Sequence, residues 1–172
     1  MISVAESLKQ DGMNSDAKTL FEQADGVLKR VTSGKADDKL KRRATIQQAI
    51  VKKNLGQYKD AIAIFGEVLG ENPNYVSLQV EAADTYHQWG RATRSTKQLA
   101  AALAGGMPVE NPKTKRTENS IWGWGRLAQV TARDKKFRDT FLQARFNLAY
   151  GRMEYAILKK SNEQLARAKR DI

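Results

Sequence analysis

The sequence predicts an all-α fold built from antiparallel helix hairpins, and three observations support this prediction. Only 3 of the 172 residues are proline, whereas Ala, Leu, Gln, Lys and Arg, which favour helices, are abundant. No segment is predicted to be a strand, because residues 75–80 alternate only briefly and continue into the helix-like stretch 81–84. Hydrophobic residues make up 41% of the chain and charged residues 28%, so the chain can bury a core.

The clearest part of a helix hairpin, its turn and its second helix, lies between residues 55 and 74. Gly56 and Tyr58 stand where one helix turns into the next. Ala61, Phe65 and Leu69 then recur every four residues, which places them on one face of a helix. The sequence Asn-Pro-Asn follows, and proline disfavours helical geometry in the residue before it, so the helix is expected to end there.

This hairpin resembles the tetratricopeptide repeat, a helix–turn–helix motif of about 34 residues. The residues that match the family's pattern are Gly56, Tyr58, Ala61, Phe65 and Pro73. They place one repeat at residues 42–75, although Thr45, Gln48 and Lys52 replace the larger apolar residues that are usual in its first helix. The resemblance implies that residues 1–172 form a single right-handed superhelical array, and we expect that array to be one domain of a larger protein.

A second repeat is expected to follow directly, at residues 76–104. Ala83 and Tyr86 fit the family's pattern there, and the turn is expected at Trp89–Gly90. The second helix of this repeat is expected at about residues 95–103.

A diverged repeat is expected upstream, at residues 1–31. The spacing of the central repeat recurs there in Gly12, Ala17, Phe21 and Ala24. Residues 32–41, which are rich in Gly, Ser, Asp and Lys, form an insertion between the two repeats, and residues 37–40 can cap and begin the next helix.

The pattern changes after residue 104. Residues 105–119 hold two of the three prolines and a Gly-Gly pair, so they are expected to form a long loop. A C-terminal helix hairpin is expected over residues 120–172, with a first helix from Ser120 to about Ala132 and a turn at residues 133–136.

The last long helix of this hairpin carries two apolar stripes. One stripe consists of Phe137, Phe141, Ala144, Leu148 and Tyr155. The other consists of Leu142, Phe146, Ala149, Met153 and Ala156. A helix that is apolar on two faces is usually sandwiched between neighbours, so we expect both stripes to be buried.

Tetratricopeptide arrays bind partners on a concave surface lined by the first helix of each repeat. The groove-facing positions that the resemblance implies are Glu6, Lys9, Arg43, Ile46, Ile50, Lys53, Asn54, Val80, Asp84 and His87. A subset of the family holds a C-terminal carboxylate with Lys and Asn on successive first helices, but here Ile46, Ile50, Val80 and Asp84 occupy those positions. The resemblance therefore implies a protein–protein interaction scaffold for a peptide or protein partner, and these residues favour an apolar or amphipathic helical segment.

The charge distribution leaves two alternatives open. The net charge is +11, and +9 of it arises from Lys113 onward. The chain could therefore bind nucleic acid or another anionic surface electrostatically, with Lys135, Lys136 and Arg138 as candidate contacts. Aromatic residues are not interleaved with the basic clusters, as a base-stacking surface would require. The other alternative is a structural spacer domain without a ligand of its own.

The sequence points to no catalytic, cofactor or metal site, and the chain is not expected to be an enzyme. It has no cysteine, a single histidine at position 87, and no phosphate-loop, dinucleotide, nucleophile-elbow or zincin motif. No apolar run long enough to span a membrane occurs, and the compartment stays undetermined. Trp122 and Trp124 lie too close together to face the same way on a helix, and we expect both to serve packing.

Overall fold

The computed structural model describes residues 1–110, 115, 117–160 and 162–170. These residues form two compact units, an N-terminal unit of Met1–Val68 and a C-terminal unit of Leu69–Ile172. Nine α-helices occur within the described ranges. The prediction of antiparallel helix hairpins is confirmed for these helices.

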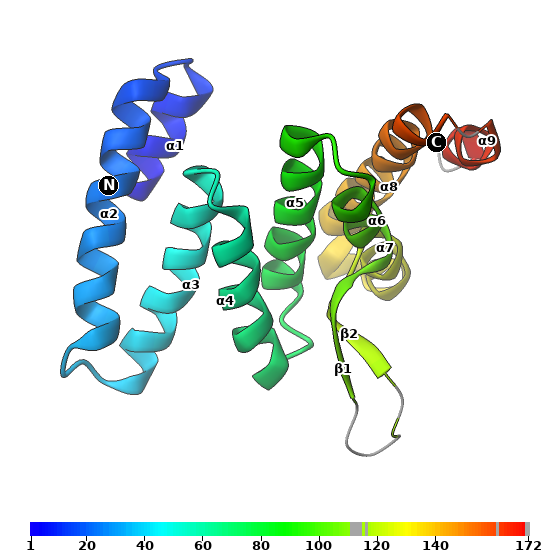
Figure 1. Ribbon diagram of the computed structural model, residues 1–172. Helices are drawn as coiled ribbons and strands as arrows, with labels where there is room; N and C mark the ends of the chain where they lie inside the picture. Colours follow the sequence, from blue (N-terminus) through cyan, green and yellow to red (C-terminus); the bar gives the residue numbers. More distant parts are fainter. Residues whose placement is uncertain (111–114, 116, 161, 171–172) are drawn as a thin grey trace. The chain divides into compact units, whose positions relative to one another are not determined.

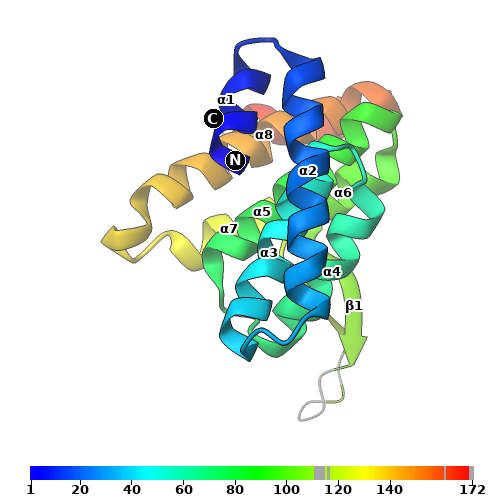
Figure 2. The same cartoon turned by 90° about the vertical axis from the view of Figure 1, so that its left-hand side faces the viewer.

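Four helices make up the N-terminal unit, and short turns make sequence neighbours antiparallel (Figure 1). Their bounds are Ile2–Gln10 for α1, Asn14–Ser33 for α2, Asp38–Asn54 for α3 and Tyr58–Glu71 for α4, which ends just inside the next unit. Figure 2 shows α1 folded back along α2. The predicted cap is present, because the Asp37 side chain accepts a hydrogen bond from the Leu40 backbone N–H at the start of α3.

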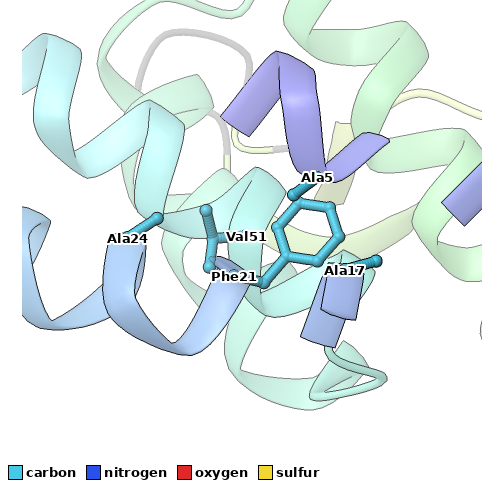
Figure 3. Packing of buried hydrophobic residues seen from close by; sticks show 5 residues of the cluster. All are labelled: Ala5, Ala17, Phe21, Ala24 and Val51. Atoms are coloured by element: carbon cyan, nitrogen blue, oxygen red, sulfur yellow. The ribbon is translucent and has the colours of Figure 1, made fainter. Parts of the chain in front are cut away.

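The core of the N-terminal unit is built around one phenylalanine (Figure 3). Phe21 of α2 is 1% exposed, and Ala17 and Ala24 lie one turn before and after it on the same face. Ala5 of α1 and Val51 of α3 complete the cluster. Small alanines around one large ring allow three helices to pack closely, which is why the spacing recognised in the sequence appears here as a buried face.

The same turn closes the first two hairpins. Gly12 and Gly56 have φ values of +82° and +75°, a left-handed conformation that favours glycine. In each turn the glycine N–H donates to the carbonyl three residues back, and the next N–H donates to the carbonyl five residues back. This shared geometry supports the equivalence of Gly12 and Gly56 that the spacing predicts.

The third turn lies four residues later than the sequence predicts. Helix α5 (Val76–Thr93) continues through Trp89–Gly90, and Arg94 takes the left-handed position, with φ 49°. The N–H groups of Arg94 and Ser95 donate to the carbonyls of Arg91 and Gly90, as in the first two turns. Gly90 instead allows α6 to approach, because a Cβ there would lie 2.8 Å from the backbone nitrogen of Leu99.

The C-terminal unit continues with helices and one short sheet. Its elements after α5 are α6 (Thr96–Ala104), β1 (Gly106–Glu110), β2 (Thr117–Ile121), α7 (Trp124–Thr131), α8 (Arg138–Lys159) and α9 (Asn162–Arg170), with a 3₁₀ turn at Lys135–Phe137. Lys160 between α8 and α9 is also left-handed, with φ 52°, and α9 begins two residues after it. Helices α2, α4 and α6 likewise begin two residues after the left-handed residue of the preceding turn. By this spacing, α8 and α9 form a hairpin of the same kind.

Part of the predicted long loop is a β-hairpin, so the expectation that the chain has no strand is wrong. Strands β1 and β2 pair antiparallel, from Gly106 opposite Ile121 to Glu110 opposite Thr117. Glycine and proline in this segment obscured the strand signal, but an isolated two-stranded pair has free edges that tolerate a proline. Residues 111–114 and 116 of the predicted loop lie outside the described residues. Because β2 runs to Ile121, the helix expected from Ser120 begins at Trp124 instead.

One buried side chain holds the β-hairpin against the helices. Gln79 of α5 is fully buried, and its amide nitrogen donates to the carbonyls of Pro73, at 2.8 Å, and Ser120, at 2.9 Å. Its amide oxygen accepts a hydrogen bond of 2.7 Å from the backbone N–H of Trp122. A single glutamine therefore satisfies three backbone groups from the α4–α5 turn and the end of β2.

Trp122 and Trp124 both serve packing, as expected. They are 3% and 0% exposed, and they flank Gly123 between β2 and α7. A Cβ on Gly123 would lie 2.4 Å from the carbonyl oxygen of Leu103, so glycine permits the backbone of α6 to pass directly beside it. The guanidinium of Arg126 covers the Trp122 ring at 4.7 Å from its centroid.

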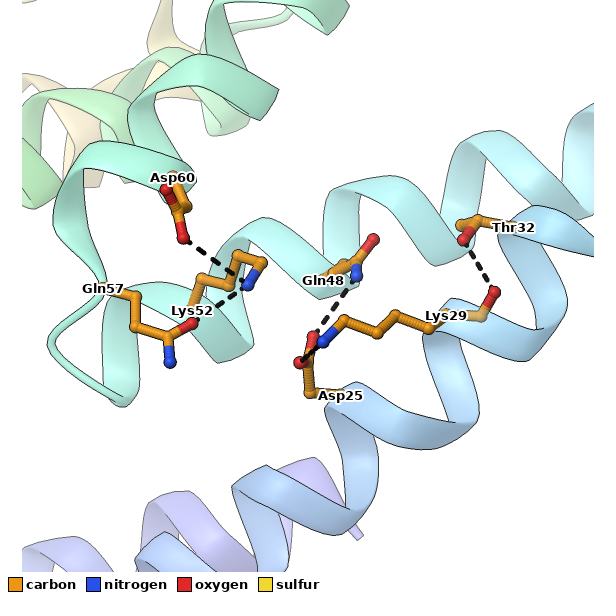
Figure 4. A network of polar contacts seen from close by, with 7 residues as sticks. All are labelled: Asp25, Lys29, Thr32, Gln48, Lys52, Gln57 and Asp60. Atoms are coloured by element: carbon orange, nitrogen blue, oxygen red, sulfur yellow. Dashed lines mark hydrogen bonds and ion pairs between the residues drawn. The ribbon is translucent and has the colours of Figure 1, made fainter.

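A buried carboxylate links α2 to α3 (Figure 4). Asp25 accepts a hydrogen bond from the Gln48 amide at 3.3 Å and forms an ion pair with Lys29 at 2.7 Å. Burial raises the pKa of Asp25, but the hydrogen bonds from Lys29 and Gln48 and the positive charge of Lys52 outweigh burial and hold the pKa below its ordinary value of 3.8. The ionised form of Asp25 is therefore the one that the fold stabilises.

The replacement of Gln79 by leucine is expected to destabilise the C-terminal unit by about 3 kcal/mol, because three buried backbone groups lose their partner. Urea unfolding followed by tryptophan fluorescence reports on this unit alone, since Trp89, Trp122 and Trp124 all belong to it. The exposed Gln129→Leu variant on α7 is the control, and it should unfold within about 0.5 kcal/mol of the wild type. Equal stability of the Gln79 and Gln129 variants would contradict the role assigned to Gln79.

The Asp25→Asn variant is expected to show a pH-dependent loss of stability. Because the folded pKa is depressed, ionised Asp25 stabilises the fold fully above pH 3.8, and this contribution disappears as the pH falls through the lower folded value. The variant should therefore melt at a lower temperature than the wild type at pH 7, and the difference between the two melting temperatures should shrink as the pH falls below 3.8. Circular dichroism measures both, with exposed Glu67→Gln on α4 as the control.

Candidate functional site

The candidate site lies in the C-terminal unit, where the first helices α5 and α8 meet. Positions on different helices can be matched by their distance from the left-handed residue that follows each helix. By this measure, Asp84, Gln88 and Arg91 of α5 correspond to Ile46, Ile50 and Lys53 of α3. The corresponding residues on α8 are Tyr150, Glu154 and Ile157. The turn after α5 lies four residues later than predicted. The groove positions of α5 are therefore Asp84, Gln88 and Arg91 instead of Val80, Asp84 and His87.

These two sets of residues contact each other across the helices. The Arg91 Nε lies 3.0 Å from Glu154 Oε1, and the Arg91 guanidinium carbon lies 5.6 Å from the centre of the Tyr150 ring. Arg91 is 55% exposed at its side chain and Glu154 is 18% exposed. The carboxylate is therefore largely shielded, while the arginine covers it from the solvent side.

The predicted groove residue His87 lies beneath this layer. It is 4% exposed, and its Nε2 lies 2.7 Å from Glu154 Oε2. With Glu154 ionised, Nε2 must carry the proton that the carboxylate accepts. His87 therefore fixes Glu154 from within the unit, and it does not line a surface as the resemblance implied.

Gly151 of α8 faces His87 of α5 and Leu103 of α6. A Cβ on Gly151 would lie 3.5 Å from the His87 ring and 3.1 Å from the Leu103 side chain. The Tyr150 ring next to Gly151 is tilted by 51° against His87, with ring centres 5.9 Å apart. His87, Arg91 and Glu154 together hold Tyr150 at the edge of the α8 surface.

An exposed apolar stripe runs along α8 beside Tyr150, and we call it the α8 stripe. Its members are Leu142, Phe146, Met153 and Ile157, with exposed fractions of 55%, 68%, 36% and 63%. They follow one another at spacings of four, seven and four residues, which keeps them on one face of the helix. The Phe146 ring stacks on Tyr150 with ring centres 6.0 Å apart and planes 7° from parallel.

The α8 stripe corrects the prediction that both apolar faces of this helix are buried. Ala144 and Leu148 of the first face are buried, and so are Ala149 and Ala156 of the second. The large members of the second face are exposed, because only its alanines lie close to neighbouring elements. The periodic signal was present in the sequence, but periodicity alone does not distinguish a core face from a binding face.

The predicted groove residues of the N-terminal unit lie in α1 and α3. Lys9 Nζ donates to Asn54 Oδ1 at 3.0 Å and to the Asn54 carbonyl at 3.4 Å, so the structure brings these two residues together. Arg43 is exposed, Lys53 is buried at 9% exposure, and the half-buried members are Glu6, Ile46 and Ile50. On α5, Val80 and Asp84 are half-buried, and Asp84 accepts a hydrogen bond of 2.6 Å from Gln88. That all ten residues line one groove stays a prediction.

The candidate anion-binding residues lie at the turn before α8. Lys135, Lys136 and Arg138 are all exposed. Asp134 lies among them, forms an ion pair of 3.2 Å with Lys136 and accepts a hydrogen bond from the Lys136 backbone N–H at 3.0 Å. The backbone hydrogen bond lowers the pKa of Asp134, so the carboxylate stays ionised and offsets part of the positive charge.

Other features of the described residues point to no ligand. A pocket of about 520 Å³ lies beside the β-hairpin, with Pro73, Trp122, Glu118 and Arg126 in its wall, and its mixed charges favour no ligand class. In the ranges that the structure describes, no three His, Cys, Asp or Glu residues gather as metal ligands would. None of the helices described there has the length and apolar character needed to cross a membrane.

The comparisons with known proteins concern the fold. No family model and no curated protein matches the sequence. Two solved structures of TPR-like repeats, from a Podosopora anserina protein designated a kinesin light chain, are similar to this chain at 16% sequence identity. The matches cover 99% of this chain and 92% of theirs, with TM-scores of 0.41 and 0.40.

The Glu154→Ala variant is expected to destabilise the C-terminal unit by about 1–3 kcal/mol, because buried His87 loses its hydrogen-bond acceptor and Arg91 its ion-pair partner. Urea unfolding followed by tryptophan fluorescence measures the loss. Glu110→Ala on β1 is the matched control, since Glu110 pairs only at the surface with Lys115, at 3.6 Å, and should contribute little. If both variants unfold alike, Glu154 does not hold α5 and α8 together.

Proposed function

We propose that this chain is a protein-interaction scaffold, and that its C-terminal unit binds a partner along α8 and the adjoining edge of α5. The α8 stripe is the observation that supports this proposal. Scattered exposed apolar residues are ordinary, but a contiguous apolar surface on a chain of this charge is typical of a binding site.

The energetics favour a partner that covers the stripe. The transfer of these partly exposed side chains out of water is worth roughly 1–2 kcal/mol for each of them. Phe146 and Tyr150 supply a stacked aromatic pair at the centre of the surface, and aromatic residues are enriched among those that dominate binding energy. Since His87, Arg91 and Glu154 already hold Tyr150, little ordering of this pair is needed on binding.

The groove predicted for the first helices is kept as part of the proposal. In the C-terminal unit, Arg91 and Ile157 match Lys53 of α3, and Tyr150 matches Ile46. Ile157 belongs to the α8 stripe, and Tyr150 stacks on Phe146 of the stripe. In the N-terminal unit, the exposed Arg43 and the linked Lys9 and Asn54 remain candidate partner contacts. The anionic-surface alternative is less favoured by the geometry, because Asp134 is paired within the basic turn.

The double variant Phe146→Ser and Ile157→Ser is expected to lose the proteins that the wild-type chain retains from an extract of the cells that express it. The two changes remove the most exposed apolar side chains of the stripe without touching the buried face, so the melting temperature should fall by no more than about 2 °C. Affinity capture followed by mass spectrometry measures retention.

Val130→Ser is the control variant, because Val130 is 46% exposed on α7 and lies outside the stripe. It should retain the same proteins as the wild type. Equal retention by the stripe variant and the Val130 variant would show that α8 is not the binding surface, and the proposed function of this face would then be abandoned.

A further inference from the structure

We infer that the α8 stripe binds the α8 stripe of a second copy of this chain, with the two helices antiparallel about a two-fold axis. This inference rests on the proposed function, because it names the partner at the same surface. The order of side chains along α8 carries it, since apolar and charged positions are arranged symmetrically about the middle of the stripe.

The apolar positions of the stripe have the same spacing when they are read from either end. Leu142, Phe146, Met153 and Ile157 are separated by four, seven and four residues. A two-fold contact requires this property, because each residue meets the residue that lies equally far on the other side of the axis. Two antiparallel stripes therefore place the first member opposite the last and the second opposite the third, and each exposed apolar side chain meets an apolar partner.

The charges at the two ends of the stripe extend this symmetry. Asp139 precedes Leu142 by three residues, Lys160 follows Ile157 by three, and both charged side chains are exposed. In the antiparallel pair, Asp139 of each copy would lie opposite Lys160 of the other, so that an ion pair closes each end of the interface. A parallel pair would bring Asp139 against Asp139 and Lys160 against Lys160. The charges therefore favour the antiparallel orientation.

These positions lie on one side of the helix. At about 100° per residue, Asp139 and the four stripe members fall within about 60° of one another around the helix axis. Lys160 directly follows α8, in the left-handed position at its end. Two facing stripes can interdigitate over about 22 Å. Phe146, which stacks on Tyr150, would lie close to the two-fold axis.

The other charged groups of α8 do not oppose a second copy. Arg91 beside the stripe is paired with Glu154, at 3.0 Å, and the two-fold packing turns this edge toward the polar Asn147 of the other copy. Arg145 and Arg152 lie behind the buried alanines of α8, and both interact within their own chain. Charges further away than about 8 Å are largely screened at physiological salt.

The expected dimer is reversible. A single pair of helices buries less than the roughly 1,200 Å² at which standard stable interfaces begin. We therefore expect a dissociation constant on the order of 10–100 μM. Sedimentation equilibrium of the full chain, at concentrations on both sides of this range, measures it.

The Phe146→Ser variant tests whether the stripe is the contact. It should weaken dimerisation by about tenfold or more, because each dimer loses two central aromatic rings. The Val130→Ser variant is the matched control, since Val130 is exposed on α7 outside the stripe, and its dissociation constant should stay within about twofold of the wild type. Dimerisation of Phe146→Ser as strong as that of the wild type would overturn the inference.

Two charge-reversed variants test the ends of the interface. Asp139→Lys brings lysine against lysine, and Lys160→Asp brings aspartate against aspartate. Each variant alone should therefore dimerise about three- to tenfold more weakly than the wild type. An equimolar mixture should recover the wild-type affinity, because both ends of the mixed dimer again join a lysine to an aspartate. Mixing does not repair a folding defect, so a mixture that stays weak shows that these two residues do not meet.

Cysteine cross-linking tests the orientation, since the chain has no cysteine of its own. A mixture of the Leu142→Cys and Ile157→Cys variants, oxidised with copper phenanthroline, should give a disulfide-linked dimer that contains one chain of each. Either variant oxidised alone should remain largely uncross-linked. Efficient cross-linking of Leu142→Cys with itself would show a parallel pair and would contradict the proposed arrangement.

The outcomes also separate this inference from the proposed function. If the wild type stays monomeric while the Phe146→Ser and Ile157→Ser double variant still loses proteins retained from the extract, another protein covers the stripe. The proposed function then stands and the second copy is wrong. If the wild type stays monomeric and retention is unchanged, both ideas fail.

Discussion

The C-terminal unit depends on the buried amide of Gln79. A fully buried glutamine costs free energy unless all of its hydrogen bonds are made, and here each of its partners is a backbone group that also needs satisfaction. The β-hairpin has only two strands, and such a hairpin is marginally stable alone. Its attachment through Ser120 and Trp122 fixes where α7 begins, and α7 in turn packs against α8. The binding face proposed on α8 therefore rests on a contact at the far end of α5.

The repeated turn explains how the chain varies its helices while keeping one architecture. Gly12, Gly56, Arg94 and Lys160 share the left-handed conformation, and a new helix begins two residues after each of them. Arg94 and Lys160 accept this conformation at some energetic cost, since they carry a Cβ. Because the turn is fixed by backbone hydrogen bonds, the preceding helix can lengthen without changing how the next helix begins. The extra turn of α5 brings Arg91 to the end of the helix, where it reaches Glu154 and Tyr150 of α8.

The sequence predicted the helices well and the surfaces poorly, for physical reasons. Ala17, Phe21, Ala61 and Phe65 are buried where the spacing places them, because helical periodicity is a local property that the chain carries in its own order. The β-hairpin and the longer α5 were missed, since the stability of both depends on distant contacts through Gln79 and Leu99. His87 was assigned to a groove because its position in the repeat was counted from a turn expected at Trp89–Gly90. The turn lies four residues later, at Arg94. Leu142, Phe146 and Met153 of the α8 stripe were recognised in the sequence as part of an apolar pattern, but Ile157 was not. The exposure of these side chains depends on which neighbours fold against the helix.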